Sequence, residues 1–314
     1  MRTPALLIAA VFGAVTVTLW ALANQPVAEP QWPERIQGFA FSPYHSGQDA
    51  VAGDFPSIEQ IDGDLVLLKD RTRSIRTYTT DSTIGEVPKL AQKHQIKVAL
   101  GAWIDARFAH NATEIERAIR LARRHDNVIR LIVGNEVILR GDIPLADLTA
   151  YLDKVRAAVK QPVSTAEPWH VWLRHPELAE HVDYLAVHML PYWEGIPADA
   201  SIGYIDSKVA ELEQAFPGKK IVLAEVGWPS NGRTREAAVA SESNEAMFLR
   251  RFLARAREQG YVYYLMEAFD QPWKAQSEGS VGAYWGVWNV DREAKFPFKA
   301  PIVRIPEWRT LAAI

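Results

Sequence analysis

The sequence contains no cysteine, which excludes thiol nucleophiles, disulfide bonds and cysteine-ligated metal sites. It also lacks an excess of basic residues, because its 314 residues hold 35 Lys and Arg against 38 Asp and Glu. A net charge of -3 gives no basic field, so a nucleic acid is not an expected partner. Hydrophobic residues make up 48% of the chain and there are 11 Trp, enough for a large core or for surfaces on which sugar rings stack.

Cofactor and metal motifs are missing as well. Neither G-x-G-x-x-G nor G-x-x-x-x-G-K-[ST] follows the first apolar run, which removes the commonest reason to expect a doubly wound sheet. His170, His175, His181 and His188 lie near one another, but their spacing fits no metal-binding motif. We therefore predict no cofactor and no metal, and we expect His188, which precedes "MLPYW", to line a pocket.

The N-terminus carries one long uncharged stretch. Residues 5–23 are apolar and close to the minimum length of a membrane span, while the Ala21-Leu22-Ala23 triplet resembles a signal-peptidase site. Residues 1–23 are thus predicted to be a signal peptide or a signal anchor. Either predicts an exported body, periplasmic or held by this segment on the outer side of the cytoplasmic membrane. Residues 24–35 are predicted to be a Pro-rich linker outside the core.

The body, residues 36–314, alternates short apolar runs with amphipathic stretches. Helices are expected over 111–125, where Asn111 and Glu114 have capping-box spacing, and over 236–260, which ends at Gly260. Residues 291–314 have no clear periodicity. Eight strands that alternate with helices predict a single (β/α)8 TIM barrel of the α/β class. The apolar runs span residues 37–44, 74–80, 97–104, 128–136, 162–169, 182–192, 220–229 and 262–270.

Two acids stand at the ends of predicted strands. Glu136 ends the fourth run in "VGNE", and Glu225 ends the seventh in "LAEVGWP". Active sites of TIM barrels lie at the carboxyl ends of the strands, so these two carboxylates are expected to flank one bond. That is the arrangement that cleaves a glycosidic bond, and the distance between the carboxylates decides between retention and inversion. A salt bridge or a helix cap is the alternative for either residue alone.

The ordered set of motifs resembles glycoside hydrolase family 17, whose members act on β-1,3-glucans with a TIM barrel. It comprises "GNE", "AEVGWP", "IRTYTTD", "PYW" and "FDQPWK" followed by "GAYWGVW". The resemblance implies that Glu136 is the general acid/base and Glu225 the nucleophile of a retaining reaction. It also implies that Asn135 binds a sugar hydroxyl and that Lys274 and Glu278 surround the acid/base.

Other polar residues are expected to support the acids. Tyr192, at the end of the sixth run, is our candidate hydrogen-bond donor to Glu225. Glu267 lies on the eighth strand, where a buried charge needs a partner, and Asp270 follows it closely. Incidental ion pairs in a solvated loop are the alternative for this late segment.

Aromatic residues at strand ends are candidates for sugar platforms, with core packing as the equal alternative for each. Trp103, Trp169 and Trp273 are the preferred subsite residues, whereas Trp228 is expected to be structural. The full set is Tyr44, Tyr78, Trp103, Trp169, Trp193, Trp228, Trp273 and Trp285.

Departures from the plant pattern, such as Val226 in place of Thr, resemble the bacterial branch of the family, some of whose members transfer glucan chains. The resemblance implies an enzyme that elongates or β-1,6-branches β-glucans, its expected partners. A plain endo-β-1,3-glucanase shares the same intermediate and stays an alternative. A membrane-anchored glucan-binding protein and a metal-dependent barrel enzyme are the alternatives from other classes.

Overall fold

A computed structural model describes residues 3–305 and 308–312 of the chain. Eight parallel strands form a closed barrel in sequence order, because β1 pairs with both β2 and β8. The predicted TIM barrel and all eight predicted strands are therefore confirmed. The strands are β1 (Phe39–Ala40), β2 (Ser74–Arg76), β3 (Lys97–Ala102), β4 (Val128–Asn135), β5 (Val163–Pro168), β6 (Tyr184–Met189), β7 (Lys220–Val226) and β8 (Val262–Leu265).

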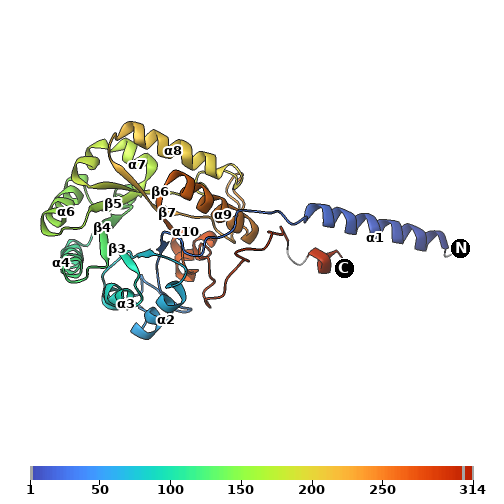
Figure 1. The fold of residues 1–314 in the computed structure, drawn as a ribbon, viewed down its shortest axis with the longest axis horizontal. Helices are drawn as coiled ribbons and strands as arrows, with labels where there is room; N and C mark the ends of the chain where they lie inside the picture. Colours follow the sequence, from blue (N-terminus) through green and yellow to red (C-terminus); the bar gives the residue numbers. More distant parts are fainter. Residues whose placement is uncertain (1–2, 306–307, 313–314) are drawn as a thin grey trace.

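Helices cover the outside of this barrel, as Figure 1 shows. No long helix follows β8 in the described residues; short turns of helix and irregular chain take its place, as the sequence predicts. The longer outer helices are α2 (Ile58–Leu68), α3 (Val87–Lys93), α4 (Phe108–Arg124), α6 (Leu145–Ala158), α7 (Trp169–Arg174), α8 (Ser201–Ala215) and α9 (Glu242–Gln259). The short ones are α5 (Val137–Arg140), α10 (Ala275–Glu278) and α11 (Trp308–Leu311).

The starts of two helices differ from the expected ones, since α4 begins at Phe108 and not at 111, and α9 begins at Glu242 and not at 236. The predicted capping box at Asn111 is wrong, because α4 starts earlier, at Phe108, and Asn111 and Glu114 are both buried in it. The Asn111 side chain bonds the backbone of Asp105, and Glu114 accepts hydrogen bonds from the neighbouring β-α loops, so tertiary contacts use both side chains. At the other end of α9, Gly260 ends the helix in the left-handed conformation as predicted.

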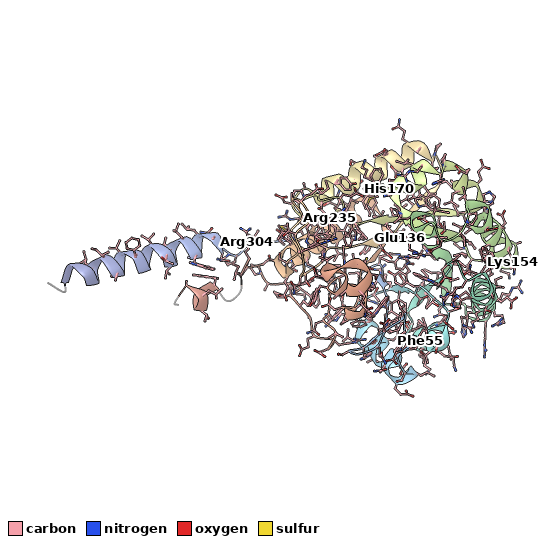
Figure 2. All side chains as sticks on the ribbon, turned by 180° about the vertical axis from the view of Figure 1, so that it is seen from behind. Phe55, Glu136, Lys154, His170, Arg235 and Arg304 are labelled. Atoms are coloured by element: carbon pink, nitrogen blue, oxygen red, sulfur yellow. The ribbon has the colours of Figure 1, made fainter. Side chains whose placement is uncertain are left out.

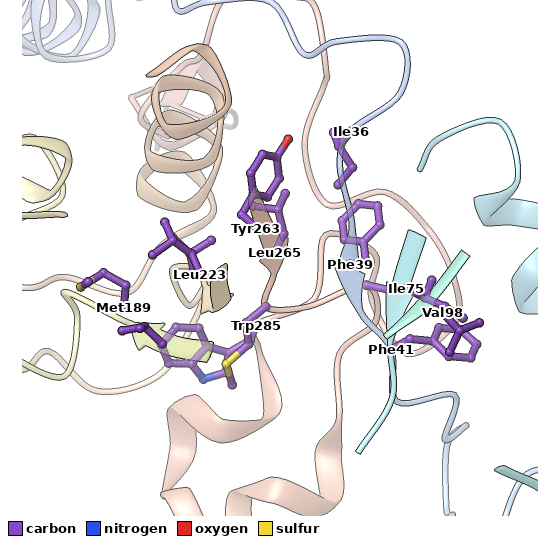
Figure 3. Packing of buried hydrophobic residues seen from close by; sticks show 14 of the residues in the cluster. Ile36, Phe39, Phe41, Ile75, Val98, Met189, Leu223, Tyr263, Leu265 and Trp285 are labelled. Atoms are coloured by element: carbon purple, nitrogen blue, oxygen red, sulfur yellow. The ribbon is translucent and has the colours of Figure 1, made fainter. Parts of the chain in front are cut away.

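Buried apolar side chains form two clusters, because alternate residues of each strand point to opposite faces of the barrel wall. Phe39, Ile75, Val98 and Leu265 belong to the larger cluster between the barrel and its helices, part of which Figure 3 shows. A smaller cluster lies inside the barrel and includes four alanines, at positions 99, 166, 186 and 224. Their small side chains leave room inside the barrel for long polar ones.

The two ends of the chain pack together on one side of the barrel. Val27 pairs with Ile302, and the buried Trp32 contacts the rings of Phe296 and Phe298. The buried guanidinium of Arg250 donates to carbonyl groups of both segments. Part of the predicted linker thus belongs to the core, contrary to expectation. The physical reason is that Trp32 removes its apolar surface from water by packing against the C-terminal segment.

The N-terminal helix α1 (Thr3–Ala23) extends away from the barrel, beside the C-terminal end of the chain (Figure 1). In the part of the chain that the structure describes, no helix combines the length and the apolar character that a membrane crossing requires.

Candidate active site

Side chains from four strands converge at the carboxyl end of the barrel. Arg76 ends β2, His188 lies on β6, Glu225 lies on β7, and Glu136 follows β4 directly. Alternate residues of a strand face the same side, and the two alternate positions of β6 before His188 belong to the inner cluster. His188 therefore points into the barrel, where Figure 2 places Glu136 near the centre.

Glu225 lies at the bottom of this group and is almost fully buried. Its Oε1 atom accepts a hydrogen bond from Arg76 Nη1 at 2.6 Å and another from the hydroxyl of Tyr78 at 2.8 Å. His188 Nε2 lies 3.4 Å from the same oxygen. Burial by itself raises the pKa of Glu225, but His188, Arg76 and Lys274 and the Tyr78 hydrogen bond outweigh it and lower the pKa. This carboxylate is therefore kept ionised.

Glu136 is the more accessible acid, with 26% of its side chain exposed against 6% for Glu225. Its backbone adopts a left-handed conformation with φ 55° between β4 and α5. His188 Nδ1 lies 2.7 Å from Glu136 Oε1, so the imidazole links the two acids. A carboxylate oxygen of Glu136 and one of Glu225 lie within 4.8 Å of each other. The structure thus brings together the two acids that the sequence places at strand ends.

Arg76 is the functional residue that the sequence analysis missed. Its guanidinium is buried, donates to Glu225, to the carbonyl of Ala224 and to Asn135 Oδ1, and stacks 4.4 Å from the ring of Tyr78. An arginine inside an apolar strand needs an anionic partner, and that signal was available in the run "SIRTYTT". Because Asn135 uses its oxygen for Arg76, its amide nitrogen is left to donate to a ligand.

A second buried ion pair lies beside Glu225. Lys274 Nζ contacts Glu267 Oε1 at 2.7 Å and lies 5.9 Å from the ring of Tyr78. Burial raises the pKa of Glu267 to about 7, although Lys274 opposes the rise. Burial also raises the pKa of Glu278, where Lys274 opposes the rise and Glu225 adds to it. The predicted grouping of Lys274, Glu267 and Glu278 near the acids is therefore observed.

Two predicted supporting residues lie elsewhere. The Tyr192 hydroxyl donates to the carbonyl of Arg233, and its ring is buried among Trp193, Trp228 and Trp285, so it is not the donor to Glu225. The donor to Glu225 is Tyr78, which follows β2, whereas Tyr192 lies beyond the end of β6 and packs in the outer core.

Asp270 belongs to a different polar group. It accepts hydrogen bonds from the backbone of Gly286 and from Lys295, whose ammonium also lies 3.3 Å from the buried Glu245. This group ties the C-terminal segment to α9 and does not include Glu136 or Glu225 in the described residues. The placement of Asp270 near the acids is therefore wrong.

The expected sugar platforms divide by burial. Trp103, Trp169 and Trp273 are partly exposed, and Arg140 and Lys208 stack on the first two rings. These three are only partly buried, whereas Trp228 and Trp285 are fully buried. Tyr44 is also buried, edge-on to Trp273 at 5.8 Å, and serves to support that ring.

Two groups of described side chains are close enough to share a cation, Glu136, His188 and Glu225 in the centre and Asp81, His110 and Glu114 at the rim. In the central group the Arg76 guanidinium already holds the Glu225 oxygen, and a second positive charge there is disfavoured by repulsion.

Comparisons with known proteins agree with this site. Residues 38–286 match the family described as the BtgE/BtgC glycoside hydrolase domain. A probable family 17 glucosidase of Saccharomyces cerevisiae is 28% identical over 259 residues, 80% of this chain and 65% of that protein. A glucan 1,3-beta-glucosidase of Schizosaccharomyces pombe is 30% identical over 253 residues, 74% of this chain and 78% of that protein.

Among solved structures, an active-site mutant of a Rhizomucor miehei beta-1,3-glucanosyltransferase in complex with laminaritriose is similar, with a TM-score of 0.74 at 27% identity. The match covers 84% of this chain and 98% of that chain.

A TIM barrel with two close glutamates at its carboxyl end has the arrangement of the enzymes that cleave O-glycosyl bonds. The chain belongs to the BtgE/BtgC glycoside hydrolase domain family, and its resemblance to glycoside hydrolase family 17 is thereby confirmed. It spans 65% of the length of the Saccharomyces cerevisiae relative and 40% of that of a probable glucan endo-1,3-beta-glucosidase of Aspergillus clavatus. The assignment to the bacterial branch stays a prediction.

Proposed function

We propose that the protein acts on β-1,3-glucosidic linkages by a retaining mechanism and transfers the glucan to a sugar acceptor, elongating or β-1,6-branching a β-glucan. The observation that carries the proposal is the pair of carboxylates within 4.8 Å, of which one is held ionised and the other is accessible. Retaining glycosidases place their carboxyl groups about 5–5.5 Å apart, and inverting ones about 6.5–9.5 Å apart.

In the first step the Glu225 carboxylate attacks the anomeric carbon, and the bond to the leaving oxygen breaks as Glu136 gives its proton to that oxygen. In the second step Glu136 takes a proton from an incoming hydroxyl, which attacks the anomeric carbon and releases Glu225. The buried position of Glu225 and the exposed one of Glu136 suit these roles, because only the acid/base must exchange protons with water.

Names of similar proteins support the substrate and the transfer. Relatives are described as glucan 1,3-beta-glucosidases, and the Rhizomucor miehei structure is that of a beta-1,3-glucanosyltransferase with laminaritriose bound. The partly exposed Trp103, Trp169 and Trp273 offer faces on which glucose rings of donor and acceptor could stack. The apolar residues 5–23 support an exported location, in the periplasm or on the outer face of the membrane.

The test is incubation of the purified chain with a linear β-1,3-linked glucose pentamer, with product masses followed over time. Products longer than the pentamer are expected, and NMR of their new linkages separates elongation from β-1,6 branching. If only shorter products form at every substrate concentration, the protein is a plain endo-β-1,3-glucanase and the transfer is refuted.

Azide rescue tests the two roles separately. In Glu136→Ala, azide should enter the second step and give a β-glycosyl azide from an activated aryl glycoside. In Glu225→Ala, azide should replace the nucleophile directly and give the α-azide. The reverse pattern, or inversion by the wild-type protein, would refute the assignment.

A further inference from the structure

Glu136 occupies a position at which a side chain normally caps the start of a helix. It is the N-cap residue of α5, and a polar N-cap side chain commonly accepts a hydrogen bond from the backbone N–H of the second or third helical residue. Here those residues are Ile138 and Leu139. Within the described residues, the Glu136 side chain makes no such bond and instead contacts His188.

A second carboxylate takes these two donors. Glu167, on the neighbouring strand β5, accepts from Ile138 N at 2.8 Å with one oxygen and from Leu139 N at 3.3 Å with the other. Glu167 is fully buried, and it reaches α5 because Glu136 N bonds the carbonyl of Ala166, next to it on β5. Glu167, a buried acid on β5, therefore caps the start of α5, which follows the neighbouring strand β4.

We propose that Glu167 is a positioning residue of the reaction, which caps α5 in place of Glu136 and so frees the Glu136 carboxylate for the substrate. The proposal rests on the proposed role of Glu136 as acid/base. Without Glu167 the two N–H groups would lose their carboxylate partner at a partly buried helix end, and Glu136 is the nearest side chain in sequence that could take its place. Turning toward α5 would withdraw it from His188 and from the glycosidic oxygen.

Glu167→Gln is the variant to make. It keeps the size of the side chain, but an amide offers one acceptor oxygen and one donor nitrogen, so one of the two N–H groups loses its partner. Burial raises the pKa of Glu167 to about 7, so an uncharged side chain of the same size is not disfavoured at this buried position. We therefore expect the variant to fold.

The readout is kcat/KM for two substrates that differ in their need for an acid. A β-1,3-linked glucose oligomer must have its leaving oxygen protonated, whereas the 2,4-dinitrophenyl glycoside of the β-1,3-linked dimer leaves without a proton. A misplaced acid costs on the order of ten- to a hundredfold. We expect Glu167→Gln to lose about that much on the oligomer and less than about twofold on the dinitrophenyl glycoside.

Glu114→Gln is the matched control. Glu114 is equally buried and also accepts backbone N–H groups at strand ends, from Thr80 at 2.9 Å and Trp103 at 3.2 Å, but it contacts neither proposed catalytic acid. Any loss it causes should be equal for the two substrates. Equal losses in Glu167→Gln, or none, would overturn the proposal.

Glu136→Gln in the same assay separates this proposal from the one it rests on. If Glu136→Gln does not discriminate between the substrates, the acid/base assignment itself fails. If Glu136→Gln discriminates and Glu167→Gln does not, only the positioning role fails. Should Glu167→Gln not fold, Glu167→Asp, whose shorter carboxylate cannot reach both N–H groups, must show the same discrimination or the proposal is wrong.

Discussion

Arg76→Met removes the buried cation that holds Glu225 in its ionised form. Arg76 is bound to Glu225 at 2.6 Å, and breaking a buried ion pair costs about 3–5 kcal/mol when the remaining charge has no partner. Tyr78 and His188 stay close to Glu225, so we expect the variant to lose at most about 3 kcal/mol of stability at pH 7, measured by urea denaturation. Such a loss is a large share of the roughly 5–15 kcal/mol of a typical domain.

The pH profile carries the sharper expectation. The native pKa of Glu225 is lowered, so removal of Arg76 raises it and leaves less of the nucleophile ionised at a given acidic pH. A hydrogen bond from a cation favours the ionised form of a carboxylate, so its loss raises the pKa. The acidic limb of kcat/KM on a β-1,3-glucose oligomer should therefore move to higher pH.

Arg130→Met is the control for loss of a barrel arginine. Arg130 lies on β4, its guanidinium stacks on Tyr184 at 5.3 Å, and it contacts neither acid. The acidic limb of the kcat/KM profile of Arg130→Met should lie at the same pH as that of the wild-type protein. A folded Arg76→Met protein with an unshifted acidic limb would refute the electrostatic reasoning. If Arg76→Met does not fold, Arg76→Lys, which keeps the positive charge, should show a smaller shift of the acidic limb.

Three further substitutions follow from the same geometry. Tyr78→Phe removes one donor to the proposed nucleophile, and we expect kcat/KM to fall about tenfold without loss of fold. Gly227→Ala places a Cβ atom 2.1 Å from the carbonyl oxygen of Met266, so we expect a loss of about 3 kcal/mol in urea denaturation, at the upper end of the usual cost of overpacking. Lys274→Met leaves Glu267 without its cation, and since the pKa of Glu267 is about 7, the loss of stability should be larger at pH 8 than at pH 5.

Each of these has an outcome that contradicts it. Gly63→Ala is the control for the glycine, because its Cβ would meet nothing within 4 Å on α2. A Gly227→Ala protein as stable as Gly63→Ala would contradict the close approach of the backbones. Wild-type kcat/KM in Tyr78→Phe would mean that its hydrogen bond does not assist Glu225. An equal loss at both pH values in Lys274→Met would show that Glu267 does not titrate in this range.

Strand positions followed from local pattern. Runs of apolar residues ending in polar ones identify buried parallel strands, because both faces of such a strand are covered. Glu136 and Glu225 were found in the same way, since a carboxylate directly after an apolar run lies at the carboxyl end of a strand. Gly260 was identified as a helix end because few other residues adopt the left-handed conformation there.

Errors arose where a side chain is used by a distant part of the chain. Asn111 and Glu114 have capping spacing, but loops from neighbouring units bind them inside α4. Tyr192 and Tyr78 both lie at strand ends, and only the direction of each side chain decides which reaches Glu225. Trp32 looked like part of a linker because its partners, Phe296 and Phe298, come at the other end of the sequence.

The sequence by itself determined the barrel and the two acids, since alternating periodicity and strand-end position are local properties. The tertiary structure decided how those acids are held. His188 meets Glu225 because β6 pairs with β7, and Arg76, which comes from β2, reaches Glu225 only because the barrel closes. The physical reason is that charge stabilisation depends on distances of a few ångströms between residues whose separation along the chain carries no such information.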